Sequence, residues 1–180
     1  MIEFAVAVRE LAEFCHRRGD IDYRFTPSPT GEEGMAGHQL VQGQRGNSYQ
    51  AEYSLQADYE FQGFRMCLRG RADGWDAQRG IIEEIKTCRV DASAIPPQVE
   101  QVHWAQALLY GGLVLLQEPA RDELEIHLTW FNIDSEQQWT REQRLSRAEL
   151  AQFLVDTVND YARWLEQLTR WREQRDRSIE

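Results

Sequence analysis

The hydrophobic and polar positions of this chain follow two spacings, and the first is that of helices. Apolar residues recur at three- and four-residue steps, which places them on one face of a helix, in residues 4–18, in residues 98–116, and from Ser146 into an Arg/Glu/Asp-rich end. The run from Thr30 to Glu33 has the Thr-x-x-Glu form of a capping box and predicts a further helix through about Gln44. The pattern therefore predicts four helices.

The second spacing is the alternation of strands. Apolar and polar side chains alternate in residues 49–57 and 124–133, and more weakly in residues 137–145, as they do along half-buried strands. Residues 68–88 hold two apolar halves separated by a polar turn that ends in Gly80, which predicts two antiparallel strands joined as a hairpin. With a loop in residues 19–29, the predicted order is helix, helix, three strands, helix, two strands and helix.

The predicted hairpin brings three chemically active side chains together. Asp73 lies near the end of its first strand, and Glu84 and Lys86 lie in its second. Residues two apart on a strand project to the same face, so Glu84 and Lys86 share one face and Glu83 projects to the other. Glu83 and Asp76 are expected at the turn or facing solvent. Two carboxylates and one ammonium predict a compact site for a metal ion and a charged substrate.

Composition and charge narrow the functions that this site can serve. A length of 180 residues fits a single domain, and a net charge of -10 argues against a protein that holds nucleic acid by bulk attraction. Contact with phosphate would then depend on a bound cation or on local arginines. Four arginines flank the hairpin motif: Arg65, Arg69, Arg71 and Arg89. The only lysine among the twenty basic residues is Lys86.

The chain carries no signal for a membrane or for secretion. Its apolar runs are too short to span a bilayer, and the first residues lack a basic region followed by an apolar run. We therefore expect a cytoplasmic protein with no membrane partner. Three widely spaced cysteines, Cys15, Cys67 and Cys88, are an odd number and predict reduced thiols.

Four short motifs occur in order on the predicted elements between residues 30 and 133. They are a helix with GMAGHQ, a strand ending in GRADG, the tripeptide Glu-Ile-Lys and a helix with Gln-x-x-x-Tyr. Each motif alone is weak, but the four in this order resemble the RecB-like branch of the PD-(D/E)XK nucleases. The arrangement also looks like the nuclease domain at the N-terminus of some bacterial helicases of the DinG and XPD group.

The resemblance implies a fold and a set of site residues. The fold is a restriction-endonuclease-like α/β core, a central mixed β-sheet flanked by helices in the order αβββαβ, in one domain over residues 1–180. The implied ligands of Mg²⁺ or Mn²⁺ are His38, Asp73, Glu84 and the main-chain carbonyl of Ile85. Lys86 would position or activate the attacking water. The residues implied to lie beside the DNA or support the catalytic face are Gln106, Tyr110 and Arg71.

The implied function is a divalent-metal-dependent deoxyribonuclease that acts on single-stranded DNA or DNA ends in repair or processing. Related nucleases hold an iron–sulfur cluster with four cysteines, but no cysteine follows Cys88, so we expect no cluster. The C-terminal helix has no terminator, which is consistent with a chain cut from a longer protein with a fused helicase domain.

Other interpretations remain open from the residues alone. Glu84 and Lys86 could form a solvated face of the sheet, Tyr110 could belong to the core, and Gln106 could bond a buried backbone group. Glu52, in the first predicted strand, could be an auxiliary acid. The chain could also be an inactive nuclease fold that docks DNA or a helicase, or a protein-interaction domain that uses its six tryptophans.

Overall fold

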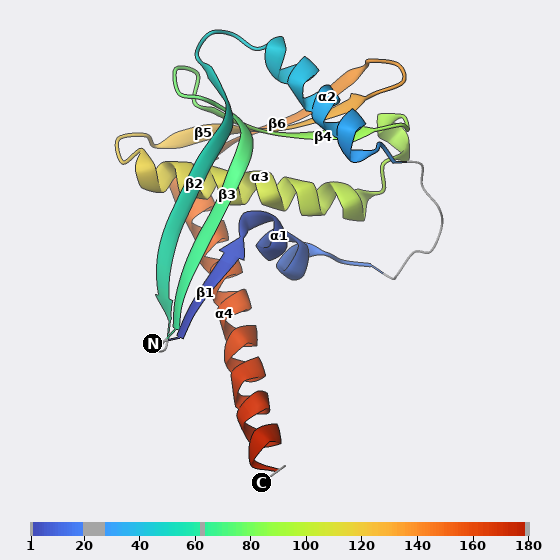
Figure 1. The fold of residues 1–180 in the computed structure, drawn as a ribbon. Helices are drawn as coiled ribbons and strands as arrows, with labels where there is room; N and C mark the ends of the chain where they lie inside the picture. Colours follow the sequence, from blue (N-terminus) through green and yellow to red (C-terminus); the bar gives the residue numbers. More distant parts are fainter. Residues whose placement is uncertain (1, 20–27, 62–63, 179–180) are drawn as a thin grey trace.

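A central mixed sheet with helices on both faces organises the chain (Figure 1). The computed structural model describes residues 2–19, 28–61 and 64–178. The strands are β1 (Ile2–Ala7), β2 (Tyr49–Phe61), β3 (Phe64–Asp76), β4 (Ile81–Cys88), β5 (Glu123–Asn132) and β6 (Gln138–Ser146). The helices are α1 (Val8–His16), α2 (Gly31–Gly43), α3 (Pro97–Gln117) and α4 (Arg147–Arg177), with a 3-10 turn η1 at Ala92–Ala94. From α2 to β5 the order is αβββαβ, so the predicted restriction-endonuclease-like core is confirmed.

The strand β3 is the branch point of the sheet. It pairs with antiparallel β2 from Phe64 to Asp76, with a break in the ladder at Asp73. Its opposite edge is divided, because residues 64–69 pair with parallel β1 and residues 74–76 pair with antiparallel β4. Residues 70–73 therefore have no second partner among the described strands. Beyond β4 the sheet continues through parallel β5 to antiparallel β6.

The two faces of the sheet are covered unequally. Helix α2 alone lies over one face, where Val41 packs against Ile85 of β4 and Phe131 of β5. Helices α1, α3 and α4 pack together on the other face and bury the main hydrophobic core. The region between β3 and β4 therefore lies beneath a thin helical cover on one side and a deep core on the other.

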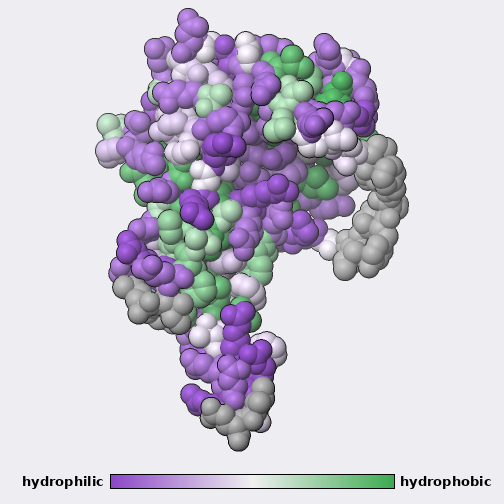
Figure 2. Space-filling view, viewed as in Figure 1, coloured by the Kyte–Doolittle hydropathy of each residue, from purple (hydrophilic) through white to green (hydrophobic). Residues whose placement is uncertain are grey.

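Helix α4 runs past the edge of the sheet and projects from the body (Figure 1). Its projecting end is largely hydrophilic in the view of Figure 2, in keeping with the Arg/Glu/Asp-rich sequence. Trp164 and Trp171 are exposed on this helix, whereas Trp75, Trp104 and Trp130 are buried. Within the part of the chain that the structure describes, no helix has the length and apolar character needed to cross a membrane.

The predicted first helix, residues 4–18, is wrong in its first turn. Residues 2–7 form β1, and the helix α1 begins only at Val8. Phe4 fits a helical spacing with Val8, but Phe4 and Val6 also alternate as strand residues do. Parallel pairing of β1 with the edge of β3 decides for the strand. Most of the loop predicted in residues 19–29 lies outside the described residues. The remaining predicted elements are confirmed, with β2 extending four residues beyond the expected Ala57 to Phe61.

Candidate metal centre

The candidate centre begins where β3 and β4 separate. Their ladder pairs Asp76 with Ile81 and Gly74 with Glu83, and one further step would pair Asp73 with Glu84. The ladder ends before that step. Instead, the main-chain N–H of Ile85 donates a hydrogen bond of 2.6 Å to Oδ2 of Asp73. A side-chain carboxylate thus takes the place of a backbone acceptor, and the strands open around it.

Glu84 lies in this opening and is almost completely buried, with 2% of its surface exposed. Its Oε1 accepts a hydrogen bond from Nζ of Lys86, while its Oε2 is buried without a partner. Burial raises the pKa of Glu84 above its ordinary value, and the Lys86 ammonium opposes that rise. A buried carboxylate oxygen without a partner is costly, and a hard divalent cation would satisfy it. The side chain therefore fits a metal ligand.

Lys86 follows two residues after Glu84 on β4 and projects to the same place, as the strand alternation predicts. Its ammonium is paired with Glu84, and its side chain keeps 21% of its surface exposed. The cation can therefore reach a molecule that approaches from solvent while Glu84 stays covered. The interpretation of this pair as a solvated face does not fit the burial of Glu84.

Helix α2 positions His38 at the opening between β3 and β4. Its N-terminus is fixed by the predicted capping box, in which the side chains of Thr30 and Glu33 bond each other's backbone N–H groups. A Cβ on Gly37 would come within 2.6 Å of Cγ2 of Thr87, so glycine lets the helix lie directly on β4. Nδ1 of His38 then lies 3.2 Å from Oδ1 of Asp73.

His38 and Asp73 form a linked pair. Burial lowers the pKa of His38, but the neighbouring Asp73 carboxylate raises it by more, so the net shift is upward. The imidazole therefore interacts with negative charge at this position, which is also where a cation would lie. Asp73 thus contacts two of the other predicted ligand residues, His38 through Oδ1 and Ile85 through Oδ2.

A residue that the sequence did not single out joins them from β2. The neighbouring pairs Ala51–Gly74 and Tyr53–Ala72 place Glu52 opposite Asp73. The ligand atoms of Glu52, His38 and Asp73 all lie within 4.8 Å of one another. They line an open cavity of about 370 Å³ between α2 and the β2–β3 hairpin. No spacing in the sequence marks Glu52, because its place depends on the register of β2 against β3.

Two polar side chains hold Glu52. Arg71 donates from Nε to Oε2 of Glu52 at 2.6 Å. Gln42 of α2 donates from Nε2 both to Oε1 of Glu52, at 3.2 Å, and to the carbonyl oxygen of Asp73, at 2.9 Å. Arg71, which the resemblance places among the DNA contacts, therefore lies at the cavity.

Gln106 and Tyr110 of α3 lie beneath the site. Both are buried, with exposures of 6% and 3%. Burial, followed by the negative charge of Glu84, raises the pKa of Tyr110, while hydrogen bonds from the Gln106 side chain and the Arg71 backbone act in the opposite direction. The Tyr110 ring leaves no room for a Cβ at Gly70 of β3. Their burial favours the supporting role over direct contact with DNA.

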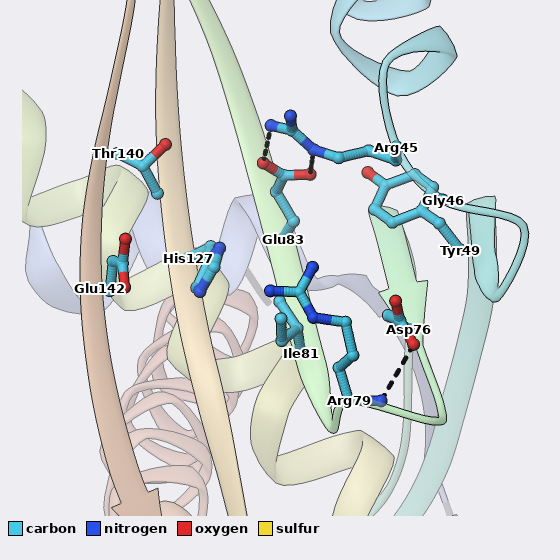
Figure 3. Close-up of a pocket in the computed structure, with 10 residues that line it drawn as sticks. All are labelled: Arg45, Gly46, Tyr49, Asp76, Arg79, Ile81, Glu83, His127, Thr140 and Glu142. Carbon is cyan, nitrogen blue, oxygen red and sulfur yellow. Dashed lines mark hydrogen bonds and ion pairs between the residues drawn. The ribbon is translucent and has the colours of Figure 1, made fainter.

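The expectation that Glu83 faces solvent is wrong. Glu83 is 1% exposed and projects to the α2 face of the sheet, where Arg45 donates to both of its oxygens at 2.6 and 3.0 Å (Figure 3). Thr129 of β5 donates a third hydrogen bond to it. A carboxylate with this many donors has no free oxygen for a metal, so of the two adjacent glutamates Glu84 is the one with an oxygen that lacks a partner.

Asp76 is confirmed as a turn residue but is buried rather than solvent-facing. Its Oδ1 accepts the N–H groups of Gln78 and Arg79, and its Oδ2 accepts the hydroxyl of Ser48. Gly80 ends the turn with a φ of 71°, a conformation that glycine adopts without strain. The turn fixes where β4 starts and so sets the position of Glu84 and Lys86 relative to Asp73.

The other flanking arginines are engaged to different degrees. Arg65 is paired with Asp58, and Arg89 is held by both Glu33 and Asp134. Arg69 is exposed and borders, with Arg71, a second open cavity of about 420 Å³ beside β2 and β3. Since Arg71 is paired with Glu52, Arg69 is better placed for phosphate than the three arginines that are held in ion pairs.

The comparisons with known proteins show a shared fold only. No protein-family model matches the sequence, and no curated protein matches it. The crystal structure of SSO0001 is 18% identical, matches 86% of this chain and 75% of its own, and has a TM-score of 0.52. A phage-related exonuclease from Haemophilus somnus 129PT is 16% identical, matches 90% of this chain and 80% of its own, and has a TM-score of 0.47. The chain therefore shares the fold of SSO0001.

Proposed function

We propose that this chain is a divalent-metal-dependent nuclease of the PD-(D/E)XK type. The observation that carries the proposal is the buried Glu84 carboxylate, which has one oxygen on Lys86 and the other without a partner, in the opening beside Asp73. Two acids and a lysine in this order match the resemblance found in the sequence. Most buried polar atoms in proteins have a hydrogen-bond partner, so a buried carboxylate oxygen without one is unusual for a purely structural ion pair.

The proposed ligands of Mg²⁺ or Mn²⁺ are Asp73, Glu84, the main-chain carbonyl of Ile85 and His38. Carboxylate and carbonyl oxygens suit both ions, and an imidazole favours Mn²⁺ over Mg²⁺. When bound, such an ion polarises a phosphoryl oxygen and lowers the pKa of a bound water. Asp73 is held for this role by the Ile85 N–H, so its position is set before any ion arrives.

Lys86 is the proposed catalytic cation. Its pairing with Oε1 of Glu84 holds the ammonium at the edge of the metal centre, with part of its side chain open to solvent. From there it can donate a hydrogen bond to the attacking water or to a phosphate oxygen and so orient the water for attack on phosphorus. Tyr110 and Gln106 of α3 support this arrangement from beneath.

The proposed substrate is DNA, as single strands or free ends, on the strength of the sequence resemblance. With a net charge of -10, contact with phosphate would depend on a bound cation or on local arginines. Arg69 and Arg71, which border the same cavity, would contact the phosphate backbone. A role in repair and a fused helicase partner belong to the same proposal and rest on the resemblance alone.

Digestion of 5′- and 3′-labelled single strands, duplexes and flaps in Mn²⁺ tests the proposal. We expect cleavage that EDTA abolishes and that Glu84→Gln, which keeps the side-chain shape, removes. His38→Ala should narrow the advantage of Mn²⁺ over Mg²⁺. A wild-type protein that binds Mn²⁺ but cuts none of these substrates would instead be an inactive nuclease-fold module. Cleavage by Glu84→Gln at the wild-type rate would overturn the site assignment.

A further inference from the structure

We propose that His103 of α3 is a positioning residue that accepts a hydrogen bond from the ammonium of Lys86 when the charge of Glu84 is neutralised, as a bound divalent cation would neutralise it. Lys86 then has two resting places, one on Glu84 and one on His103. The inference deepens the proposed function and rests on it for the consequence in catalysis, although the movement of Lys86 can be measured without any nucleic acid.

Helix α3 places His103 beside Lys86. Residues seven apart lie on nearly the same face of a helix, so His103 projects toward the sheet as Tyr110 does. Lys86 projects to the face of the sheet opposite to Glu83, which is the α3 face, and its register partner on β5 is Trp130. The ring of His103 meets that of Trp130 edge-on, with 5.5 Å between the centroids. His103 and Lys86 are therefore neighbours of the same tryptophan.

The imidazole can accept a hydrogen bond. Nδ1 of His103 is buried and has no hydrogen-bond partner among the described residues. Burial is the largest cause that lowers the pKa of His103, to about 3, and the positive charges of Lys86 and Arg9 act in the same direction. The ring is therefore neutral at neutral pH and keeps a lone pair on one nitrogen. Of these two cations, Arg9 is held on its own helix by Glu13, so Lys86 is the one that the metal centre can release.

In this structure the ammonium of Lys86 is held by Glu84. Neutralising Glu84 removes that attraction, and a divalent charge beside Glu84 would repel the ammonium. Lysine carries its charge on a flexible stem and has three N–H donors, so it can turn from Glu84 to the neutral ring of His103. One acceptor then fixes the ammonium, while its other donors face the partly open side of the centre, where a water or phosphate oxygen would bind.

Lys86 is the only lysine in the chain, so labelling lysine with ¹⁵N gives a single side-chain ammonium signal, whose hydrogen exchange reports how that group is held. Glu84→Leu keeps the buried position filled and removes the first acceptor. We expect the ammonium to stay protected in Glu84→Leu and to exchange at least about tenfold faster when His103→Phe is added, the scale of a lost hydrogen bond to a charged group. The wild type in Mg²⁺ should respond to His103→Phe in the same way, so the test does not depend on one variant folding.

Two further variants separate an acceptor from a side chain that only packs. Asparagine carries a polar atom near the place of Nδ1 but has no ring, whereas phenylalanine keeps a ring against Trp130 and has no acceptor. His103→Asn should therefore be less stable than His103→Phe in thermal unfolding and yet keep the slow exchange that His103→Phe loses. The control is His127→Phe, the same substitution on the opposite face of the sheet, beside Glu83 (Figure 3). It should leave the Lys86 signal unchanged.

Fast exchange in Glu84→Leu, or slow exchange that persists after His103→Phe both in Glu84→Leu and in Mg²⁺, overturns the proposal. Cleavage is a separate readout. His103→Phe should lower the single-turnover rate at saturating DNA by about tenfold, with KM and Mn²⁺ affinity unchanged, and His103→Asn should restore most of that rate. A Lys86 signal that depends on His103 in a protein that cuts none of the labelled substrates would support the proposal and refute the nuclease. Cleavage by His103→Phe at the wild-type rate would do the reverse.

Discussion

The main-chain N–H of Ile85 bonds the side chain of Asp73, at 2.6 Å, at the point where the backbone ladder between β3 and β4 has ended. One acid therefore has two duties. Its Oδ2 links β3 to β4 by accepting the buried N–H of Ile85. Its Oδ1 faces His38 and the candidate metal centre. Substitutions at Asp73 can separate these duties.

Asp73→Asn should keep the fold and lose the metal, whereas Asp73→Ala should lose both metal and stability. Asparagine still offers an oxygen to the Ile85 N–H, but alanine leaves that buried donor unsatisfied, at about 1–3 kcal/mol. Urea unfolding in EDTA measures the stability, and Mn²⁺ calorimetry measures the binding. Equal free energies of unfolding for the two variants would show that the Ile85 hydrogen bond contributes nothing.

Lys86→Arg should preserve folding and Mn²⁺ binding yet lower the cleavage rate by about a hundredfold or more, the scale of a lost positioning or acid–base group. A guanidinium is wider and planar, and effectively never loses its proton, so it cannot present the same compact charge beside Glu84. Single-turnover cleavage measures the rate. Arg65→Lys, at an exposed cation away from the opening, is the control. Cleavage near the wild-type rate by Lys86→Arg would contradict the catalytic role.

Gly37→Ala should destabilise the protein and weaken Mn²⁺ binding. Its Cβ would lie 2.6 Å from Cγ2 of Thr87 and 3.0 Å from Cδ1 of Phe131, which forces α2, and with it His38, away from β4. Overpacking of this kind costs about 1–3 kcal/mol. Thermal unfolding and Mn²⁺ calorimetry report the two effects.

Gly34→Ala is the matched control for that experiment. The same helix gains a better helix former, worth up to about 1 kcal/mol, and the new Cβ meets only Oγ1 of Thr87 at 3.4 Å. We expect unchanged or higher stability and unchanged Mn²⁺ affinity. If both alanines behave alike, the close approach of α2 at Gly37 does not position His38.

Asp76→Asn should reduce the acid sensitivity of the fold. Burial alone would raise the pKa of Asp76, but hydrogen bonds from the Arg79 backbone, Ser48 and Gln78 outweigh it and hold the pKa below 3.8. A lowered folded-state pKa gives stability that is present above 3.8 and lost as pH falls through the folded value. Asparagine cannot titrate, so that contribution disappears from the pH profile.

Urea unfolding midpoints at neutral pH and below pH 3.8 check this prediction. The variant should be less stable than the wild type at neutral pH, and the difference should shrink in acid. A constant difference across that range would mean that the Asp76 carboxylate is not preferentially ionised in the folded state.

Local chemistry explains which parts of the fold were predictable. The capping boxes at Thr30 and Ser146 start α2 and α4 as expected, because their hydrogen bonds join residues only three apart. The turn from Asp76 to Gly80 likewise depends on contacts within five residues. Side-chain alternation along β4 then separated Glu84 and Lys86 from Glu83 without knowledge of any partner strand.

The sequence alone determined the elements from α2 onward and the shared face of Glu84 and Lys86. Tertiary structure decided the rest. It made residues 2–7 a strand by pairing them with β3, buried Glu83 against Arg45, and set Glu52 opposite Asp73. The physical reason is how far apart along the chain the interacting residues lie. Caps, turns and alternation depend on near neighbours in sequence, whereas these three outcomes depend on the register and packing of segments that are distant in the chain.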